Sequence, residues 1–306
     1  MQVYRSLEQT PFLGNAAITI GNFDGVHLGH AQIFRTLVQE KEKGLTPMVM
    51  TFWPHPRQVL TGDSNMRFLT SMEEKVLLLK ALGIEHLLIV PFDQAFAEIQ
   101  AFDFIAHILI EKIGVKKILL GYDHHFGRNR EGDLHYLIQL APRFGYQVQE
   151  IPRQEIDHLA ISSSLIRKYL EDGVPEAAKT LLGRNYSLSG VVVEGKKLGR
   201  TLQFPTANLV VPFAQKLIPK QGVYAVLVRV GEAQYKGMMN IGYRPTVEGQ
   251  TLSLEVHLFD FSSDLYGTTI SVDFVHYLRE EQKFPSLEAL KSQLVMDKQT
   301  ASLILH

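Results

Sequence analysis

In the first 184 residues, short apolar runs alternate with longer stretches whose apolar residues recur at helical spacing. This alternation is typical of βαβ units, whose strands lie parallel in one sheet covered by helices on both faces. Ligands of such sheets bind beyond the carboxyl ends of the strands. The predicted strands are Ala16–Ile20, Met48–Phe52, His86–Val90, Lys117–Leu120 and Gln147–Ile151, and the predicted helices are Ala31–Lys43, Met72–Leu82, Phe102–Ile113 and Asp133–Arg143.

After about Arg184 the pattern changes to strand-length runs separated by Gly, Pro and Asn, with a helical pattern only at Ser286–Leu294. Regular short strands predict a small antiparallel barrel or sandwich with a terminal helix. A chain of 306 residues also has the length of two domains. We therefore expect an α/β chain with domains 1–184 and 185–306. The strand-length runs are Leu188–Val193, Val223–Val230, Gln234–Ile241, Leu252–Phe259 and Thr268–Tyr277.

The composition excludes several kinds of chemistry. The chain has no cysteine, which rules out disulfides, thiolate catalysis, cysteine-ligated zinc and iron–sulfur clusters. A net charge of −1 disfavours broad binding to nucleic acid, and no run approaches the length of a membrane span. The beginning of the chain also lacks the features of a secretory signal. We expect a cytoplasmic protein with no nucleic-acid or membrane partner.

The stretch from Gly21 to His30 follows a predicted strand and leads into a predicted helix. Glycines allow close approach of the backbone to a ligand, and a helix start offers unpaired N–H groups to a phosphate. His27 and His30 share one face of a first helical turn and could stabilise negative charge in a transition state. The alternative is a glycine-rich turn with two partly exposed histidines. The residues of this loop that are candidates to surround a phosphate are Gly21, Asn22, Phe23, Asp24, His27, Gly29 and His30.

A second polar stretch precedes an apolar helical pattern at Ser162, Ser163, Ser164 and Arg167. One serine is explained as a helix N-cap. Three hydroxyls and a guanidinium on the next turn could also surround an anionic group. Its interest is as a partner to the first loop in binding an anionic group.

In the second half, Gly195, Lys196 and Gly199 form a glycine- and lysine-rich loop that could bind phosphates. Thr206 and Asn208 could place two neutral oxygens on Mg²⁺, which takes few protein ligands. The alternative is a hairpin turn followed by a proline-terminated loop. Further on, alternation puts Glu255 and His257 on one face of a strand, with leucines and a valine on the other. These two side chains could also simply face water.

The loop Gly21–His30, with Ile161–Arg167 downstream, resembles the nucleotidyltransferases of the HxGH class, which have a Rossmann-like fold. It resembles more closely the FMN adenylyltransferase module of bacterial bifunctional riboflavin kinase/FAD synthetases. Further matches to that family are Thr51–Pro56, Gly121–Gly127, Phe204–Asn208, Asp264–Gly267 and Leu278–Phe284. Trp53, His124 and Gln203 depart from the family pattern, which usually has Gly at the last position.

The resemblance implies two successive reactions. Riboflavin would be phosphorylated by ATP in the C-terminal barrel, with Glu255 as the base and Thr206 and Asn208 binding Mg-ATP. The N-terminal domain would then join FMN to the AMP part of a second ATP and release pyrophosphate, with His27 and His30 as catalytic residues. Flavin contacts are implied for His55, Pro56 and Asp123.

Two alternatives compete with this interpretation. Class I aminoacyl-tRNA synthetases also use a His-x-Gly-His loop, but Ile161–Arg167 lacks the lysines of their second loop. A flavin-sensing or partner-binding protein could keep the same fold without turnover. The presence of His27, His30 and Glu255 favours an enzyme.

Overall fold

The computed structural model describes residues 1–121, 125–152, 155–156, 159–195, 202–246 and 249–305. Two compact units, Met1–Ser162 and Ser163–His306, make up the chain. Helices α7 (Ser163–Glu171) and α8 (Pro175–Leu182) belong to the second unit, ahead of the composition change near Arg184. These units are structural. That the two expected activities divide at Arg184 stays a prediction.

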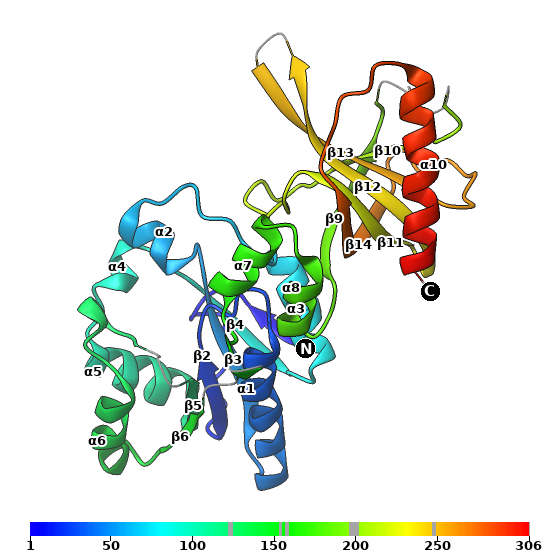
Figure 1. Cartoon of the computed structure of the whole chain (residues 1–306). Helices are drawn as coiled ribbons and strands as arrows, with labels where there is room; N and C mark the ends of the chain where they lie inside the picture. The colour runs from blue at the N-terminus through cyan, green and yellow to red at the C-terminus, as the bar shows by residue number, and fades with distance from the viewer. Residues whose placement is uncertain (122–124, 153–154, 157–158, 196–201, 247–248, 306) are drawn as a thin grey trace. The chain divides into compact units, whose positions relative to one another are not determined.

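The first unit is built on a six-stranded sheet in the order β1-β4-β3-β2-β5-β6 (Figure 1). Every neighbouring pair of strands is parallel, which confirms the fold class predicted for this half. Strand β1 lies at one edge and was not predicted, because its three residues are too few to show a period. The strands are β1 (Gln2–Tyr4), β2 (Ala16–Ile20), β3 (Thr46–Trp53), β4 (His86–Pro91), β5 (Val115–Gly121) and β6 (Gln147–Ile151).

Helices cover both faces of this sheet. Helices α1 and α3 pack on one face, while the segment η2 and helix α6 pack on the other. Consecutive residues of β2 point to opposite faces, so Ala17 joins the first core and Ile18 the second. The helical elements are α1 (Leu28–Gln39), η1 (Glu40–Lys43), α2 (Pro56–Thr61), α3 (Met72–Ala81), α4 (Gln94–Ala97), α5 (Ala101–Asp103), η2 (Phe104–Ile113), η3 (Arg128–Arg130) and α6 (Leu134–Phe144), and a small hairpin comprises β7 (Glu155–Ile156) and β8 (Leu159–Ala160).

Two helices of this unit differ from their predicted form. Helix α1 begins at Leu28 rather than Ala31, because Nδ1 of His27 accepts the backbone N–H of His30 at 3.3 Å and caps the helix. Segment η2 is helical as predicted but is wound as a π-helix. The first difference matters for function, since it places His30 inside the first helical turn.

The second unit contains a closed antiparallel barrel in the order β10-β13-β12-β11-β14-β9, which confirms the predicted architecture. The short strand β10 was expected to be a loop, yet it pairs with β9 on one side and β13 on the other and so closes the barrel. Helix α10 extends well beyond the predicted end at Leu294. The elements are β9 (Tyr186–Val193), β10 (Ala207–Val210), β11 (Gly222–Val230), β12 (Ala233–Thr246), β13 (Gly249–Leu258), β14 (Thr269–Arg279) and α10 (Leu287–Ile304).

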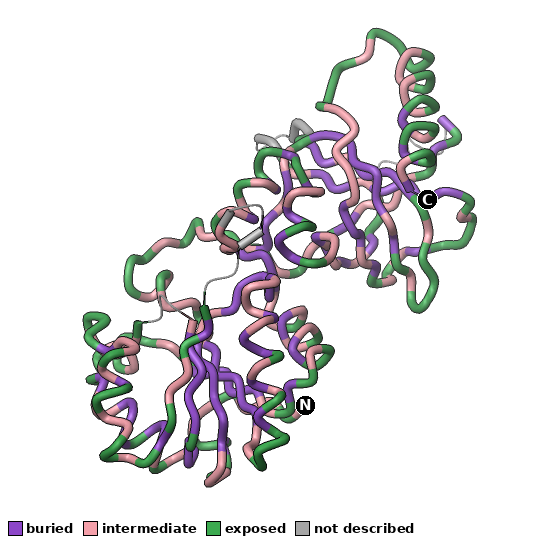
Figure 2. The backbone as a smooth tube through the Cα atoms, turned by 60° about the horizontal axis from the view of Figure 1, so that its bottom comes forward, coloured by how far each residue is buried: buried purple, intermediate pink, exposed green. Residues whose placement is uncertain are grey.

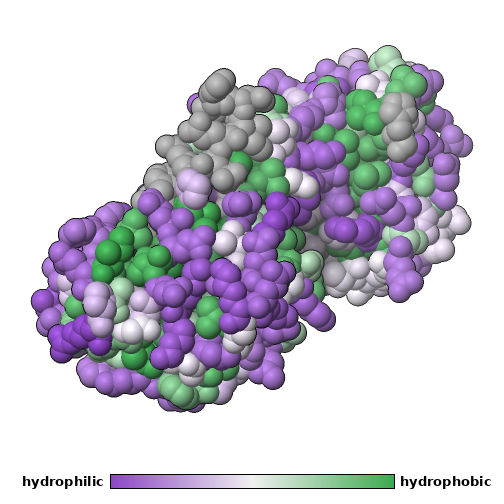
Figure 3. Space-filling model, turned by 90° about the horizontal axis from the view of Figure 1, so that it is seen from below, coloured by the Kyte–Doolittle hydropathy of each residue, from purple (hydrophilic) through white to green (hydrophobic). Residues whose placement is uncertain are grey.

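Burial follows this architecture in both units. Figure 2 shows buried backbone along the strands and a mixture of buried and exposed positions along the helices. Hydrophilic residues predominate on the face drawn in Figure 3, where apolar residues form separate patches. Within the described residues, no helix is both long and apolar enough to cross a membrane.

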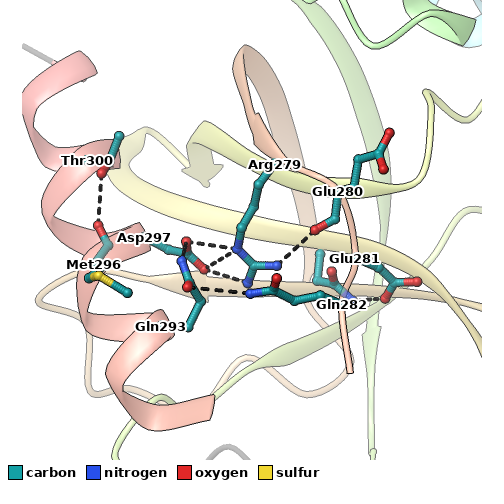
Figure 4. Close-up of polar contacts among 9 residues, drawn as sticks. Arg279, Glu280, Glu281, Gln282, Gln293, Met296, Asp297 and Thr300 are labelled. Atoms are coloured by element: carbon teal, nitrogen blue, oxygen red, sulfur yellow. Dashed lines mark hydrogen bonds and ion pairs between the residues drawn. The ribbon is translucent and has the colours of Figure 1, made fainter. Parts of the chain in front are cut away.

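Helix α10 is fastened to the barrel by an ion pair at the end of β14 (Figure 4). The guanidinium of Arg279 donates to both carboxylate oxygens of Asp297, with Nε–Oδ1 at 3.0 Å and Nη2–Oδ2 at 2.7 Å. Gln293 donates a further bond of 2.9 Å to Oδ1 of Asp297. Asp297 is only 4% exposed, so its charge depends on these partners.

Replacing Asp297 with Ala should lower the free energy of unfolding of the second unit by about 3 kcal/mol, because it leaves a half-buried guanidinium unpaired. Urea unfolding followed by far-UV circular dichroism measures this loss. The single tryptophan, Trp53, lies in the first unit and reports its unfolding separately. The exposed residue Gln299, also on α10, provides the control: Gln299→Ala should change stability by about 0.5 kcal/mol or less. An equally small effect of Asp297→Ala would contradict the role of this ion pair.

Candidate active sites

The loop Gly21–His30 begins directly after β2, in the centre of the parallel sheet. The chain passes from β2 to β3 on one side, and β5 lies on the other side. The loop therefore lies at the carboxyl end of the strand where the order reverses, which is the usual ligand position in such sheets. It turns sharply, with positive φ at Phe23, Gly25 and Val26.

Phe23 and Asp24 point inward and hold the loop. The ring of Phe23 is buried and meets the rings of His30 and Phe34 edge-on, at centroid distances of 5.2 and 4.8 Å. The carboxylate of Asp24 is buried and accepts the backbone N–H groups of Leu69 and Thr70 at 3.0 and 3.1 Å. These contacts point to a loop-holding role for both residues.

The two histidines of the loop stack on each other, with ring centroids 3.5 Å apart and planes within 17°. A Cβ at Gly29 would lie 3.2 Å from Nδ1 of His27, a tight contact. A Cβ at Gly21 would lie 2.8 Å from the ring of Phe23, which would have to move. Close packing thus favours glycine at both positions.

Two buried polar atoms of this loop have no hydrogen-bond partner among the described residues: Oδ1 of Asn22 and Nδ1 of His30. Buried polar atoms are nearly always hydrogen-bonded, so such atoms at a strand's carboxyl end are natural ligand contacts. Burial lowers the pKa of His30 well below its usual value, with further contributions from His27 and Lys75. His30 is therefore neutral at pH 7 and donates from one ring nitrogen only.

The predicted serine stretch spans the division between the units. Ser162 ends the first unit, while Ser163, Ser164 and Arg167 lie in the first turns of α7 in the second. A serine directly before a helix and two in its first turn agree with the N-cap interpretation. Their use in nucleotide binding stays a prediction.

A cavity of about 610 Å³ adjoins the loop within the first unit. It extends from Ile20, Gly21 and Asn22 to His55 and Pro56, the two described residues for which flavin contacts were predicted. Asp123, the third, lies outside the described residues, as does His124. Arginines contribute positive charge at Arg57, Arg128 and Arg130, and five phenylalanines supply its apolar wall: Phe52, Phe92, Phe96, Phe104 and Phe126.

This aromatic wall was not predicted from the sequence. The rings of Phe52, Phe92 and Phe96 contact one another at centroid distances of 5.6–5.8 Å, although they come from two separate segments. Phe104 and Phe126 form a second pair at 5.6 Å. Flat apolar rings beside convergent polar groups suit an aromatic heterocycle. The clustering of Phe92 and Phe96 just after β4 was the available sequence signal.

In the barrel, the predicted site residues come together on neighbouring strands. Asn208 on β10 and Asn240 on β12 are both directly opposite Glu255 on β13. The Glu255 carboxylate accepts hydrogen bonds from the hydroxyls of Thr206 at 3.4 Å and Ser253 at 3.1 Å. Thr206, Asn208 and Glu255, separated by up to 49 residues, therefore form one cluster.

A Cβ at Gly195 would lie 2.1 Å from the side-chain amide nitrogen of Asn208. The absence of a side chain at Gly195 therefore lets its backbone pack against Asn208. Lys196 and Gly199 lie outside the described residues. Among the residues that the structure does describe, no three His, Asp or Glu side chains are grouped to hold a metal ion. A cation beside Thr206 and Asn208 would take most ligands from nucleotide and water, which suits Mg²⁺.

His257 supports this cluster in a way that the sequence did not show. Its Nδ1 lies 2.7 Å from the carbonyl oxygen of Pro205 and must donate, because a carbonyl only accepts. Burial lowers the pKa of His257, which keeps the ring neutral. The bond fixes the residue before Thr206. Gln203 lies in the same loop and has φ 66°, in the left-handed region that glycine adopts most easily. The family that the sequence resembles usually has glycine at this position.

Similarity to known proteins covers both units. A model of the FAD synthetase family matches residues 9–165, and a model of the riboflavin kinase family matches residues 182–305. The bifunctional riboflavin kinase/FMN adenylyltransferase of Escherichia coli (strain K12) is 40% identical over 298 residues, covering 97% of this chain and 94% of that protein. The protein of the same name from Haemophilus influenzae is 39% identical over 304 residues, covering 98% of each. A crystal structure from Streptococcus pneumoniae, described as a macrolide-efflux protein, matches 98% of both chains with TM-score 0.91 and 30% identity.

We expect His30 to stay neutral when the pH is lowered well below 6.5, because its burial opposes protonation. The exposed His107 should titrate above 6.5, since its hydrogen bond with Glu111 raises its pKa. Long-range ¹H–¹⁵N NMR spectra of the imidazoles distinguish the two. Because an unfolded imidazole binds a proton with its ordinary pKa, His30 should also make the folded state less stable as the pH falls below 6.5. Parallel titration of the two histidines would contradict this prediction.

Proposed function

The chain belongs to the family of bifunctional riboflavin kinases/FMN adenylyltransferases, and we propose that its two activities are divided between residues 1–184, the adenylyltransferase, and residues 185–306, the kinase. It is an enzyme that phosphorylates riboflavin to FMN and adenylylates FMN to FAD. The substrates are small molecules: riboflavin, FMN and ATP. We place both reactions in the cytoplasm, without a nucleic-acid or membrane partner.

Adenylyl transfer takes place at the Gly21–His30 loop. A phosphate oxygen of FMN attacks the α-phosphorus of ATP, forming a P–O bond while the bond to the bridging oxygen breaks and pyrophosphate leaves. No covalent intermediate with the enzyme is needed, so the residues act by positioning and by stabilising negative charge. Nδ1 of His30, which has no partner among the described residues, supports this assignment because an imidazole nitrogen can donate to a phosphate oxygen. His27, Gly21, Gly29 and the Ser162–Ser164 stretch with Arg167 complete the proposed nucleotide site.

The flavin of this reaction occupies the phenylalanine-lined cavity. Its apolar wall matches the isoalloxazine ring in chemistry, and its volume of about 610 Å³ lies in the range of small-ligand sites. His55 and Pro56 line the cavity, and Asp123 is proposed with them. Arg57, Arg128 and Arg130 provide positive charge near the FMN phosphate.

Phosphoryl transfer takes place at the Glu255 cluster of the barrel. Glu255 accepts the proton of the 5′-hydroxyl of riboflavin as the hydroxyl oxygen attacks the γ-phosphorus of ATP. The bond from the γ-phosphorus to the bridging oxygen breaks, and ADP leaves. Gly195, Lys196 and Gly199 bind ATP, and Thr206 and Asn208 hold Mg²⁺. The cation, when bound, neutralises charge on the phosphates. The contact between Thr206 and Glu255 is the observation that carries this proposal, because it joins the base to the metal-binding loop.

Incubation of the purified protein with riboflavin, ATP and Mg²⁺, followed by chromatography of the flavins, tests the whole scheme. FMN should form first and FAD should follow. Replacing Glu255 with Gln keeps its shape and removes the proton acceptor, so FMN formation should fall by about 10²–10⁴. FAD formation from supplied FMN should be unchanged. Glu232→Gln, an exposed change on the barrel, is the control. Near-normal FMN formation by the Glu255 variant would leave the kinase base unidentified.

Replacing His30 with Ala should have the opposite selectivity. Loss of a donor to the reacting phosphates should slow FAD formation by about 10²–10³, and FMN should accumulate because phosphorylation occurs elsewhere. Both products are resolved in the same chromatogram, with the exposed His107→Ala variant as the control. Equal loss of both activities would indicate that His30 is a structural residue.

A further inference from the structure

Lys75 is a buried lysine on the inner face of α3. Its neighbour one turn on is Leu79, which is completely buried, and Lys75 itself is only 6% exposed. Lysines are rarely buried, because removing an ammonium from water costs free energy that only nearby oxygens or charges offset. The burial of Lys75 therefore requires nearby groups that stabilise its ammonium.

The ammonium group of Lys75 contacts the backbone of the Gly21–His30 loop. Its Nζ donates to the backbone carbonyl oxygen of Asn22 at 2.6 Å and to the hydroxyl oxygen of Thr51 at 3.5 Å. The hydroxyl of Thr51 donates to the same Asn22 carbonyl at 3.3 Å. Lys75 thus ties the residue after Gly21 to helix α3 and to strand β3.

Both hydrogen-bond partners of Lys75 are neutral oxygens. The nearby carboxylate of Asp24 attracts the ammonium, but its oxygens accept hydrogen bonds from Leu69 and Thr70. Lys75 also acts on the loop electrostatically, since its charge lowers the pKa of His30. Asp24 and His30 are the titratable loop groups with which it interacts. A cation placed this way contributes positive potential where anionic phosphates would bind.

We propose that Lys75 is a positioning residue for adenylyl transfer, which fixes the Asn22 carbonyl and places a positive charge next to the Gly21–His30 loop. This inference rests on the proposed assignment of the Gly21–His30 loop to that reaction. Held in this way, Asn22 and His30 meet the phosphates of ATP in a single geometry, and part of the phosphate charge is balanced before the substrate arrives.

Replacing Lys75 with Met keeps the length of the side chain and removes its charge and its donors. We expect kcat/KM for ATP in FAD formation from supplied FMN to fall about 10²-fold, as for other misplaced reacting groups. FMN formation by the same protein should be unchanged. Lys80→Met is the matched control, because Lys80 lies on the same helix and is exposed. A folded Lys75→Met variant with near-normal FAD formation would overturn the proposal.

The pH profile distinguishes a role of the charge from simple packing. Burial lowers the pKa of Lys75 to about 8, so the ammonium loses its proton as the pH rises through that value. The kcat/KM for ATP of the unaltered enzyme should fall above about pH 8. The Lys75→Met variant should lack this decline.

The pH profile of the unaltered enzyme also tests the role of Lys75 if the Lys75→Met variant does not fold. A flat profile between about pH 7 and 9 would overturn the role of Lys75 while leaving the function in place. Failure of the unaltered enzyme to form FAD from FMN at any pH would instead refute the assignment of the reaction.

Discussion

Full burial of β2 is the constraint on which the first unit depends. All five residues of this strand are buried, and its backbone pairs with β3 and β5. A strand covered on both faces leaves polar groups available only at its ends. The chain emerges there as the Gly21–His30 loop, which is held by the side chains of Asp24 and Lys75. The position of the Gly21–His30 loop is thus a consequence of how the central strand is packed.

In the second unit, closure of the β-barrel positions the candidate site residues, as the packing of β2 does in the first unit. Strand β10 is short, yet its pairing with both β9 and β13 completes the ring and puts Asn208 opposite Glu255. His257, on the same strand as Glu255, holds Pro205 and so sets the approach of Thr206. Each unit therefore builds its site from backbone pairing first and from buried polar side chains second.

The strands of the parallel sheet were predictable because buried strands appear as continuous apolar runs. Ala16–Ile20 is such a run and agrees with the structure at both ends. Gln147–Ile151 also agrees at both ends, although only Ile151 in it is buried. Strand β10 was missed, since Ala207–Val210 follows a proline and carries a polar Asn208 that suggests a loop. The position of the Gly21–His30 loop between a strand and a helix was predictable from the apolar strand before it and the helical pattern after it. Lys75 was not, because a lysine in an amphipathic helix is normally expected to face water.

The sequence by itself determined the two fold classes, the change near Arg184 and the residue types of both sites, because periodicity and local motifs are properties of neighbouring residues. Tertiary structure alone decided which distant residues share a site. The phenylalanine cavity, the Lys75–Asn22 bond, the His257–Pro205 bond and the Asp297–Arg279 ion pair all join segments far apart in the chain. Burial, which sets the charge of His30 and Lys75, depends on those same long-range contacts.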